Sequence, residues 1–509
     1  MPTQSCRSTT GRLFAGLLEQ AERRRLVVLI VRTSGAIPGR PQRDFGLLMP
    51  SFSGEELAKW SGGRWDPVCP ASLSGVSTNT RTIRPGELYV AIAGKVHDGH
   101  NFVEEAFGKG AAGALVGNDY RAGTAVQGRC LLRVPDTLAA LQNIAAGYRR
   151  DIGVEVVGVT GSAGKTTVKE MTAAVLSALG PVARTLGNFN NDIGVPLSLL
   201  SMERGTRIGV FEVGTNHPGE LAPLCAMISP RWGLLTNVGP AHLEFFGSVD
   251  AIAVEKSTLL KALPADGTAV LCRDGAFHGV LRAAAGCRVV DVSIRGDADL
   301  FVEGSSSGSD EVAVREKASG EVFRFRPPVP GDHNICNALF AIAVGRGHGM
   351  RWEDIRLGIE GYIPLPMRWA REKIRGVTII NDAYNASPVS MSAALEAFGS
   401  MKVAGRKWLV LGGMLELGVA DRDLHEQLGG RIGAGDWAGL IAVGAHGSWI
   451  AEGARKAGLI DGRIVLCSDN AAAAMALFER ATENDAVLLK GSRGMHLEEV
   501  RNQYVLLAV

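Results

Sequence analysis

Residues 156–167 read Val-Val-Gly-Val-Thr-Gly-Ser-Ala-Gly-Lys-Thr-Thr, which predicts a β-strand followed by a glycine loop and the start of a helix. Glycines let the backbone N–H groups of such a loop point inward at a phosphate group. Lys165 can reach the terminal phosphates of a nucleotide, and the Thr166 hydroxyl can bind Mg²⁺. Apolar residues recur at helical spacing from Val168 to Leu179, and a Gly-Pro pair then ends the helix. The segment therefore predicts an ATP site.

This loop is shorter than the common nucleotide-binding loop, because Val159 stands where that pattern has its first glycine. A chance glycine turn before a helix is the alternative interpretation, but the strand before the loop and the helix after it favour phosphate binding. The residues that we expect around the phosphates are Thr160, Gly161, Ser162, Ala163, Gly164, Lys165, Thr166 and Thr167.

The length and composition indicate an α/β enzyme of several domains. With 509 residues the chain exceeds one hydrophobic core, so about three domains are expected. Hydrophobic residues make up 46% and charged residues 21%, which is typical of a globular protein and excludes a fibrous or disordered one. The formal net charge is +2 and no Lys/Arg-rich run occurs, so nothing suggests a nucleic-acid partner.

The cysteines and the apolar runs bear on the compartment. The eight cysteines are scattered without a Cys-x-x-Cys pair, which favours isolated buried thiols in a reducing compartment over a disulfide framework or a zinc site. No stretch approaches the ~18 apolar residues that span a bilayer. Residues 26–31 follow three arginines, but this apolar run is shorter than the ~7–15 residues of a signal peptide. We expect a cytoplasmic monomer without membrane insertion.

The chain divides into an N-terminal extension and three α/β blocks. Residues 1–48 contain arginine clusters and a loop-like Gly/Pro segment, and we interpret them as an extension of unknown role, such as an over-long gene start. A new start follows at Met49, where Ser53 and Glu56 form a predicted capping box. The predicted domains are 49–150, a first α/β domain; 151–364, a central ATP-binding domain; and 365–509, a Rossmann-like domain.

Alternation of apolar strands with helices predicts mostly parallel sheets in these blocks. A strand meander around a turn at 304–308 is the exception, within residues 298–325. The other predicted strands are 88–93 and 114–116 in the first block, 156–159, 208–213, 232–237 and 269–272 in the second, and 377–381, 408–411, 440–443, 464–466 and 486–489 in the third.

Polar residues follow the strands of the central block. Asn188, Asn190 and Asn191 lie between glycines and offer amide donors and acceptors to a polar substrate, although an Asn-rich turn is an equal alternative. Glu212 ends an apolar strand, at the edge where α/β sheets collect ligands, and a carboxylate near phosphates needs a metal ion. A helix-capping or surface glutamate is the alternative.

His242 and Lys256 are ambiguous on sequence alone. His242 comes just after the strand 232–237, which makes a ligand role and a structural role equally reasonable. Lys256 lies inside the helix-like run 249–263, where a solvated lysine is the natural interpretation because Mg²⁺ would repel an ammonium group.

The third block supplies a second group of polar residues. Arg368 lies in the connector, where it could clamp the γ-phosphate when the domains close. Asp382, Tyr384 and Asn385 follow a strand and could contact a ribose, a phosphate or an amine. Another strand ends in a cationic turn suited to a carboxylate, formed by Lys490, Ser492 and Arg493. Cations and anions from two domains around one ATP indicate ligation in a closing cleft.

Taken in order, these motifs resemble the Mur ligase family. The likeness rests on residues 160–167, 187–196, 211–220, 237–244, 331–337, 382–388, 411–418 and 490–493. Residues 77–81, 85–88 and 98–102 resemble the family's UDP-binding domain, so the likeness runs from about residue 50 to the end. Residues 216–220 and 382–385 point to the branch that adds D-alanyl-D-alanine.

The resemblance implies an α/β, three-domain architecture with a central P-loop ATPase-type parallel sheet and a C-terminal Rossmann-like domain. It also implies an ATP-dependent ligase that joins D-alanyl-D-alanine to UDP-N-acetylmuramoyl-tripeptide through an acyl phosphate, in the last cytoplasmic step of peptidoglycan precursor synthesis. A folylpolyglutamate-type amide ligase and a nucleotide-binding module without catalysis are the alternatives.

By the same resemblance, Lys165, His242, Lys256 and Arg368 are catalytic, and Thr166, Glu212, His242 and Lys256 hold two Mg²⁺ ions, with Lys256 carbamylated. Asn334, Asn337, Arg368 and Asp382 would contact ATP. The implied substrate contacts are Ser77, Thr80, Arg81, Asn188, Asn190, Asn191, Asn216, His217, Tyr384, Asn385, Lys490, Ser492 and Arg493. One departure from the family pattern is Gly413, where an aspartate is more common.

Overall fold

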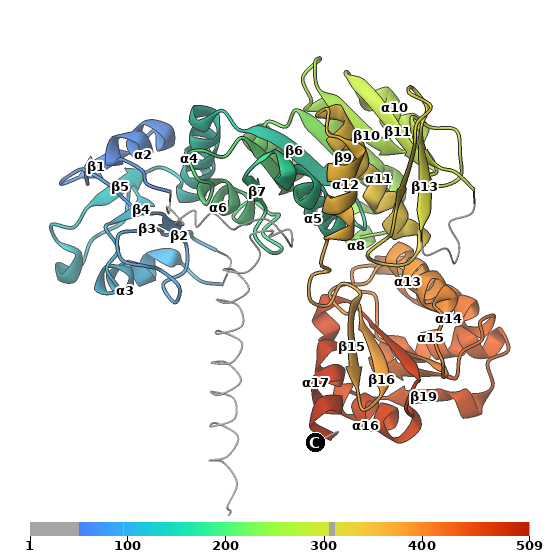
Figure 1. Ribbon diagram of the computed structural model, residues 1–509. Coiled ribbons are helices and arrows are strands. Elements are labelled where there is room, and N and C mark those ends of the chain that lie inside the picture. Colours follow the sequence, from blue (N-terminus) through green and yellow to red (C-terminus); the bar gives the residue numbers. More distant parts are fainter. Residues whose placement is uncertain (1–49, 95, 305–310, 508–509) are drawn as a thin grey trace, which may run out of the picture. The chain divides into compact units, whose positions relative to one another are not determined.

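The computed structural model describes residues 50–94, 96–304 and 311–507, which form a mixed α/β protein with three sheets (Figure 1). The predicted N-terminal extension 1–48 lies outside the described residues, as does nearly all of the turn predicted at 304–308. In the described part of the chain, no helix is both long enough and apolar enough to cross a membrane.

The first sheet has five strands in the order β1-β5-β4-β3-β2, and only the edge strand β1 is antiparallel to its neighbour. Ser53 and Glu56 form the predicted capping box at the start of its first helix. The strands are β1 (Arg64–Asp66), β2 (Val76–Ser77), β3 (Leu88–Val90), β4 (Gly113–Gly117) and β5 (Leu131–Val134), and the helices are α2 (Gly54–Ser61), α3 (Val103–Gly108) and α4 (Thr137–Ile152).

The second sheet has nine strands in the order β14-β13-β12-β11-β10-β9-β6-β8-β7. Its strands are parallel up to β12, and β12, β13 and β14 form the predicted antiparallel meander. The bounds are β6 (Glu155–Thr160), β7 (Val182–Arg184), β8 (Ile208–Glu212), β9 (Trp232–Leu235), β10 (Thr268–Cys272), β11 (Arg288–Ser293), β12 (Leu300–Val302), β13 (Val312–Glu316) and β14 (Val322–Phe325).

Eight α-helices accompany this sheet, and they include the helix predicted after the glycine loop. They are α5 (Lys165–Leu176), α6 (Gly194–Leu200), α7 (Leu221–Ile228), α8 (Leu243–Phe246), α9 (Val249–Lys261), α10 (His278–Ala284), α11 (Asp332–Gly347) and α12 (Trp352–Glu360).

The third sheet has six strands in the order β15-β16-β20-β17-β18-β19, and only the edge strand β15 is antiparallel. This edge strand was not predicted, because charged residues interrupt its apolar pattern. The strands are β15 (Ala370–Ile374), β16 (Val377–Asn381), β17 (Lys407–Leu411), β18 (Gly439–Val443), β19 (Ile464–Cys467) and β20 (Ala486–Lys490), and the helices are α13 (Pro388–Ser400), α14 (Asp421–Gly433), α15 (Gly444–Lys456), α16 (Asn470–Arg480) and α17 (Glu498–Leu507).

The hydrophobic core continues from one sheet to the next. One cluster of buried side chains contains Val157 of β6, Phe340 of α11 and Leu488 of β20. A second cluster contains Leu88 of β3 and Phe211 of β8. Because parallel strands are covered on both faces, they read as the unbroken apolar runs that the sequence shows. The domain boundaries 49–150, 151–364 and 365–509 stay predictions, since these clusters cross them.

Candidate active site

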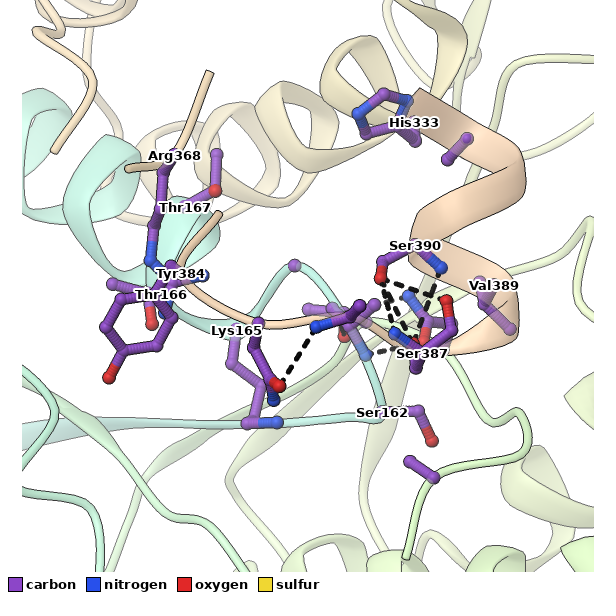
Figure 2. A pocket seen from close by; sticks show the side chains of 18 of the residues that line it. Ser162, Lys165, Thr166, Thr167, His333, Arg368, Tyr384, Ser387, Val389 and Ser390 are labelled. Carbon is purple, nitrogen blue, oxygen red and sulfur yellow. Dashed lines mark hydrogen bonds between the residues drawn. The ribbon is translucent and has the colours of Figure 1, made fainter. Parts of the chain in front are cut away.

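A cavity of about 740 Å³ opens beside the carboxyl ends of β6, β8 and β9 and is also lined by the third sheet's loops. This is the edge at which α/β sheets bind ligands. Figure 2 shows Arg368, Tyr384 and the first turn of α13 around the same cavity as Lys165. Most of the predicted residues line it: Ser162, Ala163, Gly164, Lys165, Thr166, Thr167, Asn188, Asn190, Asn191, Glu212, Asn216, His242, Asn334, Asn337, Arg368, Asp382, Tyr384, Asn385, Lys490, Ser492 and Arg493.

The glycine loop joins β6 to α5 as predicted. Gly164 has a φ of +80°, and a Cβ there would lie 2.7 Å from Asn337 Oδ1, so only glycine fits. The Lys165 ammonium donates to the Gly161 carbonyl at 2.8 Å, and desolvation lowers the pKa of this lysine. Thr160 and Gly161 do not line the cavity, and the Thr160 hydroxyl instead donates to the Val213 carbonyl at 2.9 Å. The loop itself faces the cavity.

Glu212 ends β8 and is buried, with 2% of its surface exposed, which excludes the surface interpretation. Its carboxylate accepts hydrogen bonds from the Thr166 hydroxyl at 2.7 Å and from Asn190 Nδ2 at 2.8 Å. Burial raises its pKa, but the nearby ammonium groups of Lys169 and Lys165 outweigh this effect and bring the pKa below its usual value. The carboxylate is therefore ionised beside the phosphate loop.

The oxygen atoms of Glu212 and Thr166 fit Mg²⁺ if phosphate oxygens complete the coordination shell of the ion. Among the described residues, no cluster of three His, Cys, Asp or Glu side chains is placed to hold a metal ion. Mg²⁺ commonly uses one or two protein oxygens together with waters and substrate phosphates. The Glu212 carboxylate and the Thr166 hydroxyl, at the cavity wall, are such a pair.

Lys169 is a buried cation that the sequence reasoning missed. It lies one helical turn after Lys165 on α5, and its side chain is fully buried. Its ammonium donates to the carbonyls of Thr185 at 3.0 Å and Gly187 at 3.3 Å and pairs with Glu170 at 2.9 Å. These bonds hold the segment that leads from β7 to the asparagines 188–191. Its position four residues after Lys165 places it on the same face of the helix, which was the sequence signal available for it.

The expectation that Lys256 is a solvated helix lysine is wrong. It lies on the inward face of α9 with 3% of its surface exposed, and it is not among the residues that line the cavity. Burial, together with the charge of nearby Lys165, lowers its pKa to about 7, against a weaker opposing effect of Glu255. Such an amine is neutral in a large fraction of molecules near pH 7.

His242 contacts a residue that was assigned no role from the sequence. Its Nδ1 makes a short hydrogen bond with Glu416 Oε2, 174 positions away in the chain, and the Glu244 N–H donates to the Glu416 carbonyl at 3.1 Å. Both His242, at a φ of +56°, and Glu416, at +65°, adopt the left-handed backbone region that non-glycine residues seldom occupy. Desolvation lowers the His242 pKa, although Glu416 acts in the opposite direction.

Buried polar contacts hold the loop that carries Glu416. The Met414 N–H donates to His425 Nε2 at 2.9 Å, and the Leu415 N–H donates to Ser492 Oγ at 2.9 Å. A Cβ at Gly413 would lie 2.7 Å from His446 Nδ1, so a larger residue there would require the His446 side chain to move. The loop is thus tied both to Ser492 and to a histidine beneath it.

The positively charged side chains in and just before the third sheet differ in whether a carboxylate already pairs with them. The Arg368 guanidinium lies 4.0 Å from the Tyr384 ring centre in a cation–π contact, at the cavity wall. Lys490 is 3% exposed and its ammonium pairs with Asp382 at 2.6 Å. Lys490 therefore neutralises Asp382, whereas the sequence predicted a cation available to a carboxylate. Arg493 pairs with Glu498 at 2.6 Å.

The first turns of α11 carry the two asparagines predicted at the adenine. Asn334 and Asn337 are buried and hydrogen-bonded to each other, with Asn337 Nδ2 donating to Asn334 Oδ1 at 3.3 Å. Beside them His333, which the sequence reasoning missed, lines the cavity, and burial lowers its pKa to about 4. A neutral imidazole at this wall suits an uncharged group such as a base or sugar.

Four predicted substrate residues do not line this cavity. Ser77, Thr80 and Arg81 belong to the first sheet or its following turn. His217 is exposed, pairs with Glu220 at 3.0 Å and lies with its ring tilted against that of Phe245, at 4.3 Å between ring centres. Any role of these four residues stays a prediction.

Comparison with known proteins gives the family. Residues 159–345 match the Mur ligase middle domain, and residues 367–493 match the Mur ligase glutamate ligase domain. The UDP-N-acetylmuramoyl-tripeptide–D-alanyl-D-alanine ligase of Bacillus subtilis is 37% identical over 429 residues, which cover 84% of this chain and 92% of that protein. The chain belongs to the Mur ligase family.

Solved Mur ligase structures have the same three-domain architecture. The MurF crystal structure from Acinetobacter baumannii aligns with a TM-score of 0.81 and 28% identity, over 90% of this Mur ligase and 100% of that chain. MurF ligase from Thermotoga maritima, solved in complex with ADP, aligns with a TM-score of 0.73 and 28% identity, over 85% and 97%. The predicted fold class, with its central P-loop sheet and its C-terminal Rossmann-like sheet, is confirmed.

Proposed function

We propose that this Mur ligase uses ATP to join D-alanyl-D-alanine to UDP-N-acetylmuramoyl-tripeptide, which completes the cytoplasmic precursor of peptidoglycan. One observation supports the proposal most strongly. The glycine loop and the buried Glu212 line the same cavity as Arg368 and Tyr384, which come from residues 365–509. Relatives named for this reaction match over most of their length, which supports the same choice of substrates.

The reaction has two steps. The terminal carboxylate of the tripeptide attacks the γ-phosphorus of ATP, and the bond to the β-phosphate oxygen breaks to release ADP and form an acyl phosphate. The amine of D-alanyl-D-alanine then attacks the acyl carbon, and phosphate leaves as the amide forms. Because charge develops on the transferred phosphoryl group, cations placed around it do most of the catalytic work.

The residues around the loop have distinct roles in this proposal. Lys165 would hold the β- and γ-phosphates, and Arg368, which lines the same cavity, would contact the γ-phosphate. Thr166 and Glu212 would hold one Mg²⁺ and His242 and Lys256 a second, and Mg²⁺ would neutralise phosphate charge there. Asn334, Asn337 and Asp382 would orient the adenosine.

Lys256 supports a further part of the proposal, its carbamylation. With a pKa of about 7, its neutral amine is available to add to the carbon of CO₂, losing one proton to give a carbamate. The product is an anion near Lys165, whose ammonium the unmodified Lys256 ammonium would repel. Carbamylation would thus turn an unfavourable buried cation into a metal ligand.

The remaining predicted contacts divide between the two substrates. Ser77, Thr80 and Arg81 would bind the uridine nucleotide, and the asparagines 188–191 with Asn216 and His217 would hold the peptide. The D-alanyl-D-alanine would be held by Tyr384, Asn385, Lys490, Ser492 and Arg493, with Lys490 acting through its ion pair with Asp382 and not as a free cation. We expect the enzyme to act as a monomer in the cytoplasm.

A substrate-matrix assay tests the function. ADP release is measured with UDP-N-acetylmuramoyl peptides of different lengths, combined with D-alanyl-D-alanine or with single amino acids. We expect release to require both the tripeptide nucleotide and the dipeptide. Equal release with one free amino acid would favour an earlier Mur-type step, and folate-dependent release would favour a folylpolyglutamate-type ligase.

Glu416→Gln should slow the reaction by about tenfold while ADP affinity changes little, because it weakens the contact that positions His242. Val419→Ala, at an exposed position just after the same loop, is the matched control and should leave the rate unchanged. The rate of ADP release under saturating substrates is the measurement. A Glu416→Gln enzyme with the wild-type rate would contradict the positioning role.

A further inference from the structure

Two cysteines meet at the wall of the cavity, although the sequence suggested isolated thiols. Cys272 is the last residue of β10, and Cys336 lies in the second turn of α11, 64 positions later. Their sulfur atoms are 3.4 Å apart, and both residues line the cavity. Of the seven cysteines in the part of the chain that the structure describes, these two are the pair whose sulfurs are in contact.

The surroundings give the two thiols different characters. The Cys336 thiol donates its hydrogen bond to Cys272 Sγ, which lowers the pKa of Cys272 and raises that of Cys336 well above its usual value. The pair therefore combines a thiol that ionises more easily with a protonated neighbour at contact distance. That is the arrangement in which one sulfur reacts first and the other resolves the product.

We propose that Cys272 and Cys336 form a reversible disulfide when hydrogen peroxide enters the cavity, and that this bond weakens nucleotide binding. In the first step, Cys272 Sγ attacks a peroxide oxygen, the O–O bond breaks, and the leaving hydroxide takes a proton to become water. In the second step, Cys336 Sγ attacks the resulting sulfenic acid, the S–O bond breaks, and a second water leaves. The two thiols supply the two electrons that reduce the peroxide.

For the bond to form, the two cysteine side chains, or the segments that carry them, must move. A disulfide has an S–S length of about 2.05 Å, so the sulfurs must approach each other by about 1.3 Å. Cys336 lies between Asn334 and Asn337, and Asn337 approaches Gly164 of the glycine loop. On the other side, Cys272 leads into Asp274, which also lines the cavity. Where the segment that carries Cys336 moves to close this gap, Asn334 and Asn337, to which the proposed function assigns the nucleotide, move with it.

The test measures formation of the Cys272–Cys336 disulfide and the change in ADP affinity separately. The full-length protein is treated with hydrogen peroxide, digested without reduction and mapped by mass spectrometry, while ADP affinity is measured by calorimetry before oxidation, after it and after dithiothreitol. We expect a Cys272–Cys336 peptide pair and an ADP Kd raised roughly tenfold, which corresponds to a loss of about 1.4 kcal/mol of binding free energy. Dithiothreitol should restore the affinity.

Single replacements make the result specific. In Cys272→Ser and Cys336→Ser, peroxide should give no bridge and no change in ADP affinity that dithiothreitol reverses, whereas Cys287→Ser, away from the cavity, should behave like the wild type. Two thiols that stay reduced or become sulfinic acids without a bridge would overturn the proposal, and so would a bridge that leaves ADP affinity unchanged. The inference rests on the proposed nucleotide site. If the reduced protein bound no ADP, that site would be refuted. The peptide map would still show whether the Cys272–Cys336 disulfide forms.

Discussion

Lys165→Ala is expected to lower the rate of ADP release by at least about 10³-fold, the largest loss we foresee from one substitution. The ammonium stands at the start of α5 beside the buried Glu212 and faces the cavity. No other described side chain replaces it, because Lys169 directs its ammonium at the carbonyls of Thr185 and Gly187. The γ-phosphoryl group would then lose its nearest fixed cation.

The fold should survive this substitution. The hydrogen bond from Lys165 to the Gly161 carbonyl contributes about 1 kcal/mol, too little to unfold a protein of this size. Lys261→Ala, an exposed lysine at the end of α9, is the control for general effects of charge removal. Near-normal turnover by Lys165→Ala, with the thermal unfolding midpoint unchanged, would refute the assignment of the phosphates to this loop.

Replacement of Lys256 should have the second largest effect, a loss of about 10²- to 10³-fold in the rate of ADP release. Lys256→Arg cannot form a carbamate, and its guanidinium stays charged in a site that is 3% exposed. Because that buried charge could also disturb packing, Lys256→Met, which is uncharged and of similar length, is the companion variant. Both should lose activity to a similar extent if the carbamate is what the reaction needs.

Dependence on CO₂ separates the carbamate from a purely structural role. Wild-type enzyme held in CO₂-depleted buffer should lose activity that bicarbonate restores, and neither variant should respond. The intact mass of the native wild-type protein should include one added CO₂. Lys261→Arg, on the solvent side of the same helix, is the matched control and should respond like the wild type. Full activity of Lys256→Arg would contradict the metal-ligand role.

Much of the fold follows from local patterns. The strand, glycine loop and helix at 155–176 are contiguous, so each part is specified by residues that are close in sequence. The third sheet was predicted nearly strand by strand, because parallel strands buried on both faces are unbroken apolar runs. β1, β2, β5, β7, β11 and β15 escaped prediction, since strands of two or three residues and strands interrupted by charged residues lack that signal.

In the candidate site, too, local sequence patterns predicted some residues and not others. Glu212 and the glycine loop were placed correctly because each follows directly from a strand end. The environment of Lys256 was not predicted, since burial of a helix lysine depends on which face the rest of the fold covers. The pairing of Lys490 with Asp382 joins residues 108 positions apart, which no local pattern reports.

The sequence by itself determined the family, the glycine loop and the edge of the sheet at which the cavity opens. These features depend on residue types at short spacing, which backbone geometry converts directly into structure. Only the tertiary structure decided that Glu416 meets His242, that Lys490 is neutralised and that Cys272 touches Cys336. Each of these contacts joins residues far apart in the chain, and the charge, pKa and reactivity of a side chain are set by such neighbours rather than by its own identity.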